Sequence, residues 1–150
     1  MHRRTQRTTA QVTALTAMAR AVSELERDTL ELLKTADLSL AQYNFLRVLR
    51  GAGPGGLTCG EVGGRLIRHD PDVTRLADRL AQRGLIERAR SERDRRVVVT
   101  YITTQGLALL ASLDEPVDAL HERQLGHMSE DQLRQLATLA DTSTFRIQRE

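Results

Sequence analysis

The sequence predicts a mainly α-helical fold that carries one small β-hairpin. The chain has 150 residues, of which 28% are charged and only 3% are aromatic, a balance typical of packed amphipathic helices. Ser39, Thr58 and Ser129 are each followed three positions later by Glu or Gln, the spacing of a helix-capping box. Only the segment 85–102 contains two β-rich runs around a charged loop, which indicates a hairpin.

The segment 10–33 predicts a long first helix. Its apolar side chains recur at alternating steps of three and four residues, so they form one stripe; they include Leu15, Met18, Val22, Leu25 and Leu32. A helix of about 24 residues is about 36 Å long, which exceeds a small core. The stripe therefore needs a partner surface, whereas the polar and basic residues 1–9 are expected to form a loose arm.

Two capping pairs place the next two helices. Ser39 and Gln42 start a helix at position 40, which we expect to end near position 50, before the glycine- and proline-rich run 51–56. Thr58 and Glu61 start a short helix that we expect to reach about position 68. Two glycines inside this helix each cost about 1 kcal/mol relative to alanine, so tertiary packing must support it.

The fourth helix is expected between Asp70 as its cap, with Pro71 at the first helical position, and a stop at Gly84. Strands at about 85–89 and 96–102 then flank the loop 90–95. Thr103 caps a fifth helix, which we expect to kink or restart at Pro116. A third capping pair, at positions 129 and 132, opens a last helix that reaches about position 149.

This order of helices followed by a hairpin is that of a winged helix-turn-helix, which binds DNA through its recognition helix and its wing. Thr74 and Arg75 lie near the start of the fourth helix and are our candidates for base contacts, while Arg79 is a candidate for a phosphate contact. Asp72 lies in the same first turn, where the helix dipole favours it, and we count it among the candidate DNA-binding residues. Asp78 is spaced to pair with Arg75 or Gln82; a merely solvated helix face is the alternative interpretation.

The loop of the hairpin, SERDRR at 91–96, carries three arginines and two acids. Arg93 or Arg95 could enter the minor groove, where the potential favours arginine. Asp94 is expected to pair with Arg96 and thereby stiffen the wing. The net charge of the whole chain is only +2, so the placement of charge, and not its sum, indicates a nucleic-acid partner.

The segment VTRLADRLAQRGLIERARSERDRRVVVTYITTQG resembles the signature of the MarR family of transcriptional regulators. The matched parts are the start of the helix at 73–76, the turn around Gly84 and the wing at 94–96; Ser91-Glu92 departs from the Asp-Pro that the family often has. The resemblance implies a homodimer on palindromic double-stranded DNA, usually a repressor that a small-molecule effector releases. It also implies that Arg95 is the wing-tip contact and that Asp94 and Arg96 brace it.

The expected organisation is one domain over 1–150. The winged helix-turn-helix would occupy 38–102, and the helical parts 10–36 and 103–149 would form the dimer, as the resemblance implies. The long apolar stripes support a dimer independently, because a chain of this size cannot bury them easily. By the same resemblance, an effector pocket is expected near the second helix, at Tyr43 and Arg47.

Two alternative functions remain open from the sequence. Cys59 follows the cap Thr58, where a helix dipole can activate a thiol, so an oxidation-responsive regulator is one alternative; a small apolar packing role is the plainer interpretation of the same residue. The second alternative is a winged helix that binds proteins instead of DNA, although its wing would then be expected to carry apolar anchors.

The rest of the sequence argues against an enzyme, a metal site and a membrane-spanning segment. There is no nucleophile elbow, P-loop or paired-carboxylate pattern, so we expect neither an enzyme nor a cofactor. The spacing of His121, Glu122 and His127 does not suit a metal site. No apolar run approaches the length of a membrane span, and one cysteine fits a reducing compartment, so we expect a cytoplasmic protein.

Overall fold

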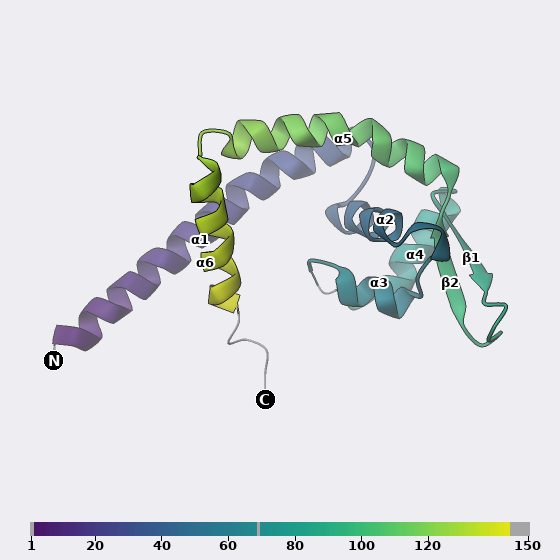
Figure 1. Cartoon of the computed structure of the whole chain (residues 1–150), viewed down its shortest axis with the longest axis horizontal. Coiled ribbons are helices and arrows are strands. Elements are labelled where there is room, and N and C mark those ends of the chain that lie inside the picture. The colour runs from purple at the N-terminus through teal and green to yellow at the C-terminus, as the bar shows by residue number, and fades with distance from the viewer. Residues whose placement is uncertain (1, 69, 145–150) are drawn as a thin grey trace.

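The computed structural model describes residues 2–68 and 70–144, and within them the fold is a set of helices with one hairpin (Figure 1). The elements in order are α1 (His2–Lys34), α2 (Leu40–Ala52), the 3-10 turn η1 (Gly53–Gly55), α3 (Cys59–Arg65), α4 (Val73–Gln82), β1 (Ile86–Arg90), β2 (Val98–Ile102), α5 (Thr104–Leu125) and α6 (Glu130–Thr144). The predicted fold class is confirmed.

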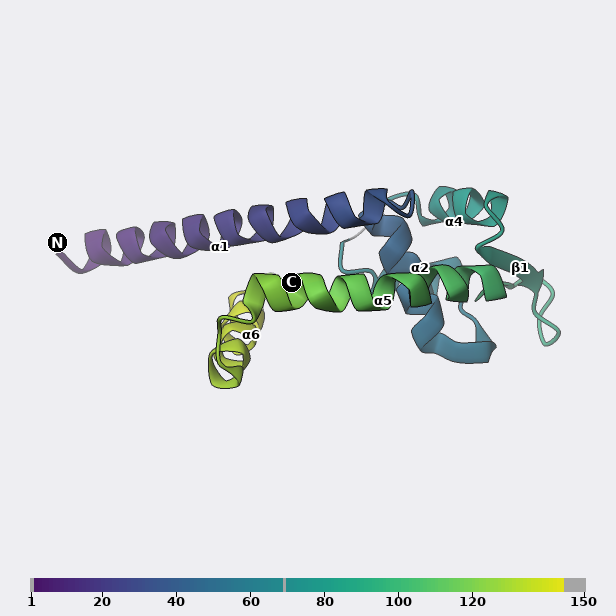
Figure 2. The ribbon, with the colours of Figure 1, turned by 90° about the horizontal axis from the view of Figure 1, so that it is seen from above.

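The molecule is elongated, with its compact part at one end. In Figure 1, α2, α3, α4 and the hairpin gather beneath one end of α5, while α1 extends away from them toward the N-terminus. Figure 2 shows α1 and α5 running lengthwise beside each other, with α6 folded back at the far end of α5. The long helices therefore present much of their surface outside the compact part.

α1 is longer than the sequence analysis predicted. It begins at His2, so residues 2–9 are helical and do not form the loose arm that we expected. The physical reason is that neither glycine nor proline interrupts the chain between His2 and Lys34, so the helix can continue to its end. Beyond the compact part its stripe is exposed, as at Val12, Leu15 and Val22.

The predicted capping boxes at Ser39 and Thr58 are confirmed, since each side chain accepts the expected backbone N–H and receives the reciprocal bond. The same two bonds are present at Ser129. α3, however, ends at Arg65, earlier than expected, because Leu66 already has an extended backbone. The last helix was predicted to reach about position 149, but positions 145–150 lie outside the described residues, as does His69.

One other predicted boundary was wrong, and of the two alternatives expected at Pro116 the restart is excluded. The cap of α4 is Asp72, not Asp70; the carboxylate of Asp70 instead accepts the N–H of Asp72 and closes a turn before the helix. α5 does not restart at Pro116, which lies inside one continuous helix. A proline removes only one N–H, and buried Leu113 and Val117 on either side hold the helix against the core.

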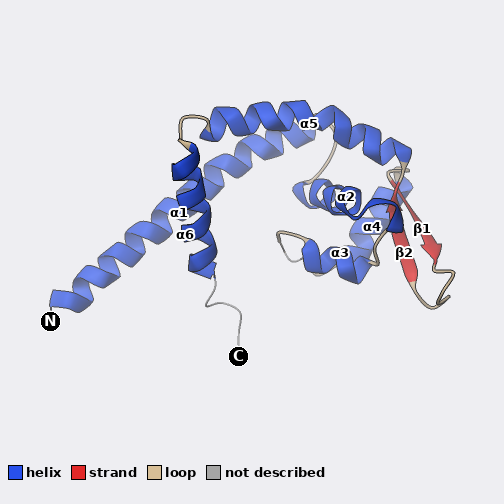
Figure 3. Ribbon diagram, in the orientation of Figure 1, coloured by secondary structure: helices blue, strands red, loops and turns tan. Residues whose placement is uncertain are grey.

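The core lies between the end of α1, α2, α4 and α5. Its largest fully buried side chains include Leu33, Phe45, Leu46, Leu49, Leu80 and Leu110. The hairpin joins this core through Ile86 and through the backbone pairing of Leu57 with Thr100, which attaches β2 to the segment before α3 (Figure 3). The core thus fixes α4 and the hairpin relative to each other. None of the helices in the described ranges is long and apolar enough to cross a membrane.

Candidate nucleic-acid interface

α4 has one buried and one open face. Leu76, Ala77 and Leu80 are buried against the core. The opposite face is exposed and carries Thr74, Arg75, Asp78, Arg79 and Gln82. Because a helix in a DNA groove must turn polar side chains outward, this face has the composition and the accessibility that a recognition helix needs.

The first turn of α4 is held by Asp72. Its carboxylate accepts the backbone N–H of Arg75 at 3.1 Å, so its negative charge lies at the positive end of the helix. The structure therefore gives Asp72 a capping role, which differs from a direct contact with a base. The side chain of Arg75 stays exposed, and in the described residues its guanidinium has no ion-pair partner.

Asp78 is paired, but not with the residues that the sequence suggested. Its carboxylate binds the guanidinium of Arg88 from β1, rather than Arg75 or Gln82. The second nitrogen of Arg88 reaches the sulfur of Cys59 at 3.7 Å. Arg88 therefore neutralises the acid on the open face of α4, and among the residues that the structure describes Arg75 and Arg79 have no ion-pair partner.

The wing is a hydrogen-bonded turn. The N–H of Arg96 donates to the carboxylate of Asp94 and the N–H of Val97 donates to its carbonyl, both at 2.9 Å. The guanidinium of Arg90 donates to the carbonyl of Arg95, also at 2.9 Å. Asp94 thus braces the wing as expected, but it does so through the backbone of Arg96 and not through an ion pair with its side chain.

The arginines of the wing point their charge to solvent. Arg93, Arg95 and Arg96 are all exposed, and no ion pair involves their side chains within 2–68 and 70–144. α4 packs against β1, so these arginines and those of α4 lie on neighbouring elements (Figure 3). Five free guanidiniums on two adjacent elements can bind phosphates and guanine.

Three other arginines have structural roles that the sequence analysis did not predict. Arg88 links β1 to α4, Arg68 binds Glu26 of α1 at 2.8 Å, and Arg83 donates to backbone carbonyls at the end of α1. The partners of Arg68 and Arg83 are far away in the sequence, so no local pattern signals these bonds.

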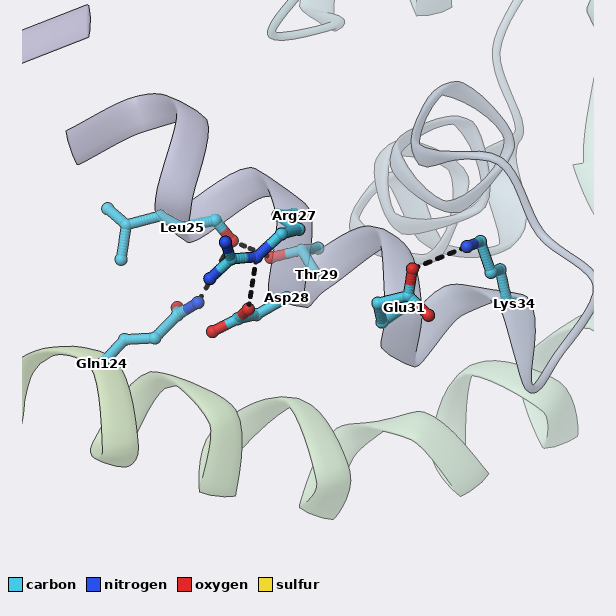
Figure 4. Close-up of polar contacts among 7 residues, drawn as sticks. All are labelled: Leu25, Arg27, Asp28, Thr29, Glu31, Lys34 and Gln124. Carbon is cyan, nitrogen blue, oxygen red and sulfur yellow. Dashed lines mark hydrogen bonds and ion pairs between the residues drawn. The ribbon is translucent and has the colours of Figure 1, made fainter. Parts of the chain in front are cut away.

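The contact between the long helices α1 and α5 was also not predictable from a local pattern in the sequence. The side chain of Gln124 on α5 donates to the carbonyl oxygen of Leu25 on α1 at 3.1 Å (Figure 4). That carbonyl also accepts the hydroxyl of Thr29 at 3.0 Å. Ion pairs between Lys34 and Glu31 and between Arg27 and Asp28 lie farther along the same helix. Gln124 therefore ties α5 to α1.

The expected effector residues do not line the cavity that the structure shows beside α1. Tyr43 is buried, and the guanidinium of Arg47 lies 5.6 Å from the centre of its ring. Burial raises the pKa of the Tyr43 hydroxyl, and the nearby Arg47 and Arg50 oppose this shift. A cavity of about 410 Å³ is lined instead by α1, the start of α2 and the α3–α4 connection, and neither Tyr43 nor Arg47 lines it.

Cys59 is half-buried, with its sulfur 3.9 Å from the hydroxyl of Thr100. It is the only cysteine in the chain. In the part of the chain that the structure describes, no group of three or more His, Cys, Asp or Glu residues is arranged to hold a metal ion. The interface of α4 and the wing is therefore the richest arrangement of functional groups in these residues.

The chain is similar to a protein-family model and to several solved structures. Residues 36–97 match a family model described as MarR family. The chain is 41% identical to a MarR transcription factor from Planctomyces limnophilus, with a TM-score of 0.68 over 87% of this chain and 94% of that one. A cysteine-to-serine mutant of MarR from E. coli, complexed with operator DNA, is 26% identical, with a TM-score of 0.75 over 85% and 90%.

A third similar structure is the PcaV transcriptional regulator from Streptomyces coelicolor in complex with its natural ligand. It is 23% identical, with a TM-score of 0.69 over 82% of this chain and 88% of that one, so it shows the likeness of the fold alone. None of the curated proteins compared with the chain matches it.

Proposed function

This chain belongs to the MarR family of transcriptional regulators, and we propose that it regulates transcription as a homodimer bound to palindromic double-stranded DNA. One observation carries the proposal: α4 and the wing expose five arginines without ion-pair partners in the described residues, while Asp72, Asp78 and Asp94 beside them are engaged in hydrogen bonds or an ion pair. Guanidiniums that lie close together without partners repel one another, and an anionic partner relieves this repulsion. The phosphates of the DNA backbone are that partner.

In the proposed complex, the start of α4 enters the major groove. Arg75 pairs with guanine and Thr74 contacts a neighbouring base, while Arg79 holds a phosphate. Asp72 keeps the first turn of α4 in shape through its cap. Arg95, assisted by Arg93, extends from the wing into the minor groove, and Asp94 holds the wing in the conformation that presents them.

The dimer follows from the long helices. Val12, Leu15 and Val22 on α1 are each more than half exposed, and Leu139 on α6 is 69% exposed. Exposed apolar surface of this extent is typical of an interface. Two copies joined through α1, α5 and α6 would place their α4 helices on the two half-sites of one palindrome, about 10 base pairs apart.

The regulator acts as a repressor that a small molecule releases. The regulation of DNA binding by 6-hydroxynicotinic acid in BpsR from Bordetella bronchiseptica, and the ligand complex of PcaV, motivate this part of the proposal. The protein acts by binding and not by catalysis, and it works in the cytoplasm, where its DNA lies. Residues 38–102 form the DNA-binding part of the single domain.

The test is a titration of the full-length protein against labelled DNA from the region upstream of its own gene, with scrambled DNA as a control. At several salt concentrations, the logarithm of the affinity should fall with a slope of about −0.9 per neutralised phosphate. The upstream DNA should bind more tightly than the scrambled DNA at every salt concentration. A flat salt response, or equal binding of both DNAs, would contradict the proposal.

A further inference from the structure

The cavity of about 410 Å³ lies outside the DNA interface, between α1, the start of α2 and the connection from α3 to α4. Its apolar lining consists of Leu30, Leu40, Ala41, Leu66 and Pro71. Its polar lining consists of Glu26, Ser39, Asn44, Arg68 and Asp70. The volume and the mixture of an apolar wall with a few polar groups are those of a small-molecule site.

Most of the polar groups in this lining already have partners. The hydroxyl of Ser39 caps α2, and the carboxylate of Asp70 accepts the N–H of Asp72 at 2.8 Å. Glu26 accepts a hydrogen bond from Arg68 at 2.8 Å. The amide of Asn44 has no hydrogen bond within the described residues, so it remains free to orient a ligand.

The charge of the lining is unbalanced toward the negative. Glu26 and Asp70 contribute two carboxylates against the single guanidinium of Arg68. The side chain of Arg68 is 67% exposed, whereas that of Glu26 is only 24% exposed, so the carboxylate lies deeper than the cation that neutralises it. A cation that enters the cavity would therefore reach Glu26 in a less solvated position, where the attraction is stronger.

The rim of the cavity adds no net charge, since the acids Glu24 and Glu31 are matched there by Arg27 and Lys34. A groove on α1 shares Glu26 and Leu30 with the cavity, and its other acids are Glu24 and Glu31. Lys34 is paired with Glu31, while Glu24 has no ion pair in the described part of the chain. The net negative charge therefore lies inside the cavity, where an anionic ligand would be repelled and a cationic ligand attracted.

We propose that this cavity binds a small organic cation, namely an ammonium group on an apolar body. The ammonium group pairs with Glu26 in place of Arg68 and is oriented by Asn44. The apolar body packs against Leu30, Leu40 and Leu66. This site is separate from Tyr43 and Arg47, and its ligand has the opposite charge to the 6-hydroxynicotinic acid that regulates BpsR.

The position of the cavity connects it to the DNA interface. Arg68 lies in the segment that leads from α3 into α4, and its bond to Glu26 ties this segment to α1. A ligand that displaces Arg68 removes this tie and frees the start of α4, where Thr74 and Arg75 lie. The cation should therefore weaken operator binding; this regulatory step rests on the proposed function.

The site can be tested without DNA. Isothermal titration calorimetry of the full-length protein would compare 2-phenylethylammonium with 3-phenylpropanoate, two probes of similar size and opposite charge. We expect the ammonium probe to bind at least tenfold more tightly than the acid. Equal or tighter binding of the acid, or no binding of either probe, would overturn the proposal.

Variants assign the binding to this cavity. Glu26→Gln should weaken ammonium binding at least tenfold, and Ala41→Leu should do the same by filling the space. Arg68→Gln should strengthen it severalfold, because it removes the cation that competes for Glu26; a loss of binding in this variant would contradict the proposal. Glu115→Gln on α5 removes an exposed carboxylate away from the cavity and should leave binding unchanged, and thermal unfolding would verify that each variant folds.

The regulatory step has its own readout, which is operator affinity with and without the ammonium probe. If the chain does not bind DNA at all, the proposed function fails, while calorimetry still decides whether the cavity binds cations. If the probe binds but operator affinity stays unchanged, the coupling through Arg68 is wrong.

Discussion

Arg83, the C-terminal cap of α4, donates a hydrogen bond to the carbonyl oxygen of Asp37 at 2.5 Å. Its second nitrogen donates to the carbonyl of Ala36 at 3.2 Å. Asp37 belongs to the turn between α1 and α2 and has a positive φ of 51°. One arginine thus fixes the end of α4 to the end of the long helix α1, so the position of α4 depends on that of α1.

Arg83→Gln should lower the free energy of unfolding by about 1–2 kcal/mol, since it removes charge-assisted hydrogen bonds from a side chain that is 32% exposed. It should also weaken operator binding, because α4 is no longer fixed at this end. Chemical denaturation and a DNA titration would measure the two effects. The matched control is Arg79→Gln, which should weaken DNA binding without a loss of stability; unchanged stability in Arg83→Gln would contradict the bracing role.

Arg95→Ala should reduce operator affinity by about 1–3 kcal/mol if Arg95 reads the minor groove. The side chain is exposed and makes no ion pair in the described residues, so its removal should leave unfolding and dimer formation unchanged. Anisotropy titrations and light scattering would measure affinity and oligomeric state. Arg123→Ala, an exposed arginine on α5, serves as the control for loss of charge alone; an equal effect of both changes would remove Arg95 from the interface.

Asp94 offers a test in which charge and structure predict opposite results. Asp94→Ala removes a negative charge close to DNA, which alone would raise affinity. It also removes the acceptor for the N–H of Arg96, so the wing loses its brace and affinity should fall. Asp94→Asn keeps an acceptor oxygen and loses the charge, so it should bind more tightly than Asp94→Ala. If both variants bind more tightly than the unaltered protein, the brace is unimportant for binding.

Local patterns in the sequence predicted what local forces determine. The capping boxes at Ser39 and Thr58 involve residues three apart, and both are present. The outward face of α4 follows from helical periodicity, and the exposure of Thr74 and Arg75 agrees with it. Where two local signals competed, at Asp70 and Asp72, the sequence alone chose the wrong cap, since both are good capping residues beside a proline.

Contacts between distant segments could not be predicted in this way. Asp78 was expected to pair within its own helix, but Arg88 reaches it from β1 because the hairpin packs against α4. Arg68 and Glu26 are 42 positions apart, and only the packing of the α3–α4 connection on α1 brings them together. The cavity that this pair borders was missed for the same reason.

Gly64→Ala should stabilise the protein by about 0.5–1 kcal/mol, because alanine favours a helix over glycine and a side chain at this position has open space. Gly63→Ala in the same helix should gain less or destabilise, since its added carbon would lie 3.1 Å from the side chain of Val73. Thermal and chemical unfolding of the two variants would measure the difference. Equal gains from both would mean that α3 and α4 pack less closely here than the structure indicates.

Glu61 predicts a pH dependence of stability. The backbone N–H of Thr58, and then its hydroxyl, hold the pKa of the Glu61 carboxyl below its ordinary value of 4.5. Because the folded pKa is lowered, the unfolded chain binds this proton more readily. The stabilisation is therefore fully present above pH 4.5 and is lost as the pH falls through the folded pKa.

Glu61→Gln should consequently be less stable than the unaltered protein near pH 7, and the difference should shrink as the pH falls below 4.5. The amide can still accept a hydrogen bond from Thr58, so the variant removes mainly the charge of the capping box. Unfolding free energies from denaturant titrations across this pH range would measure the effect. Glu92→Gln, at an exposed position on the wing, corrects for the general effect of losing a negative charge. A difference that stays constant with pH, or that grows at low pH, would show that the charged cap of α3 does not contribute to stability.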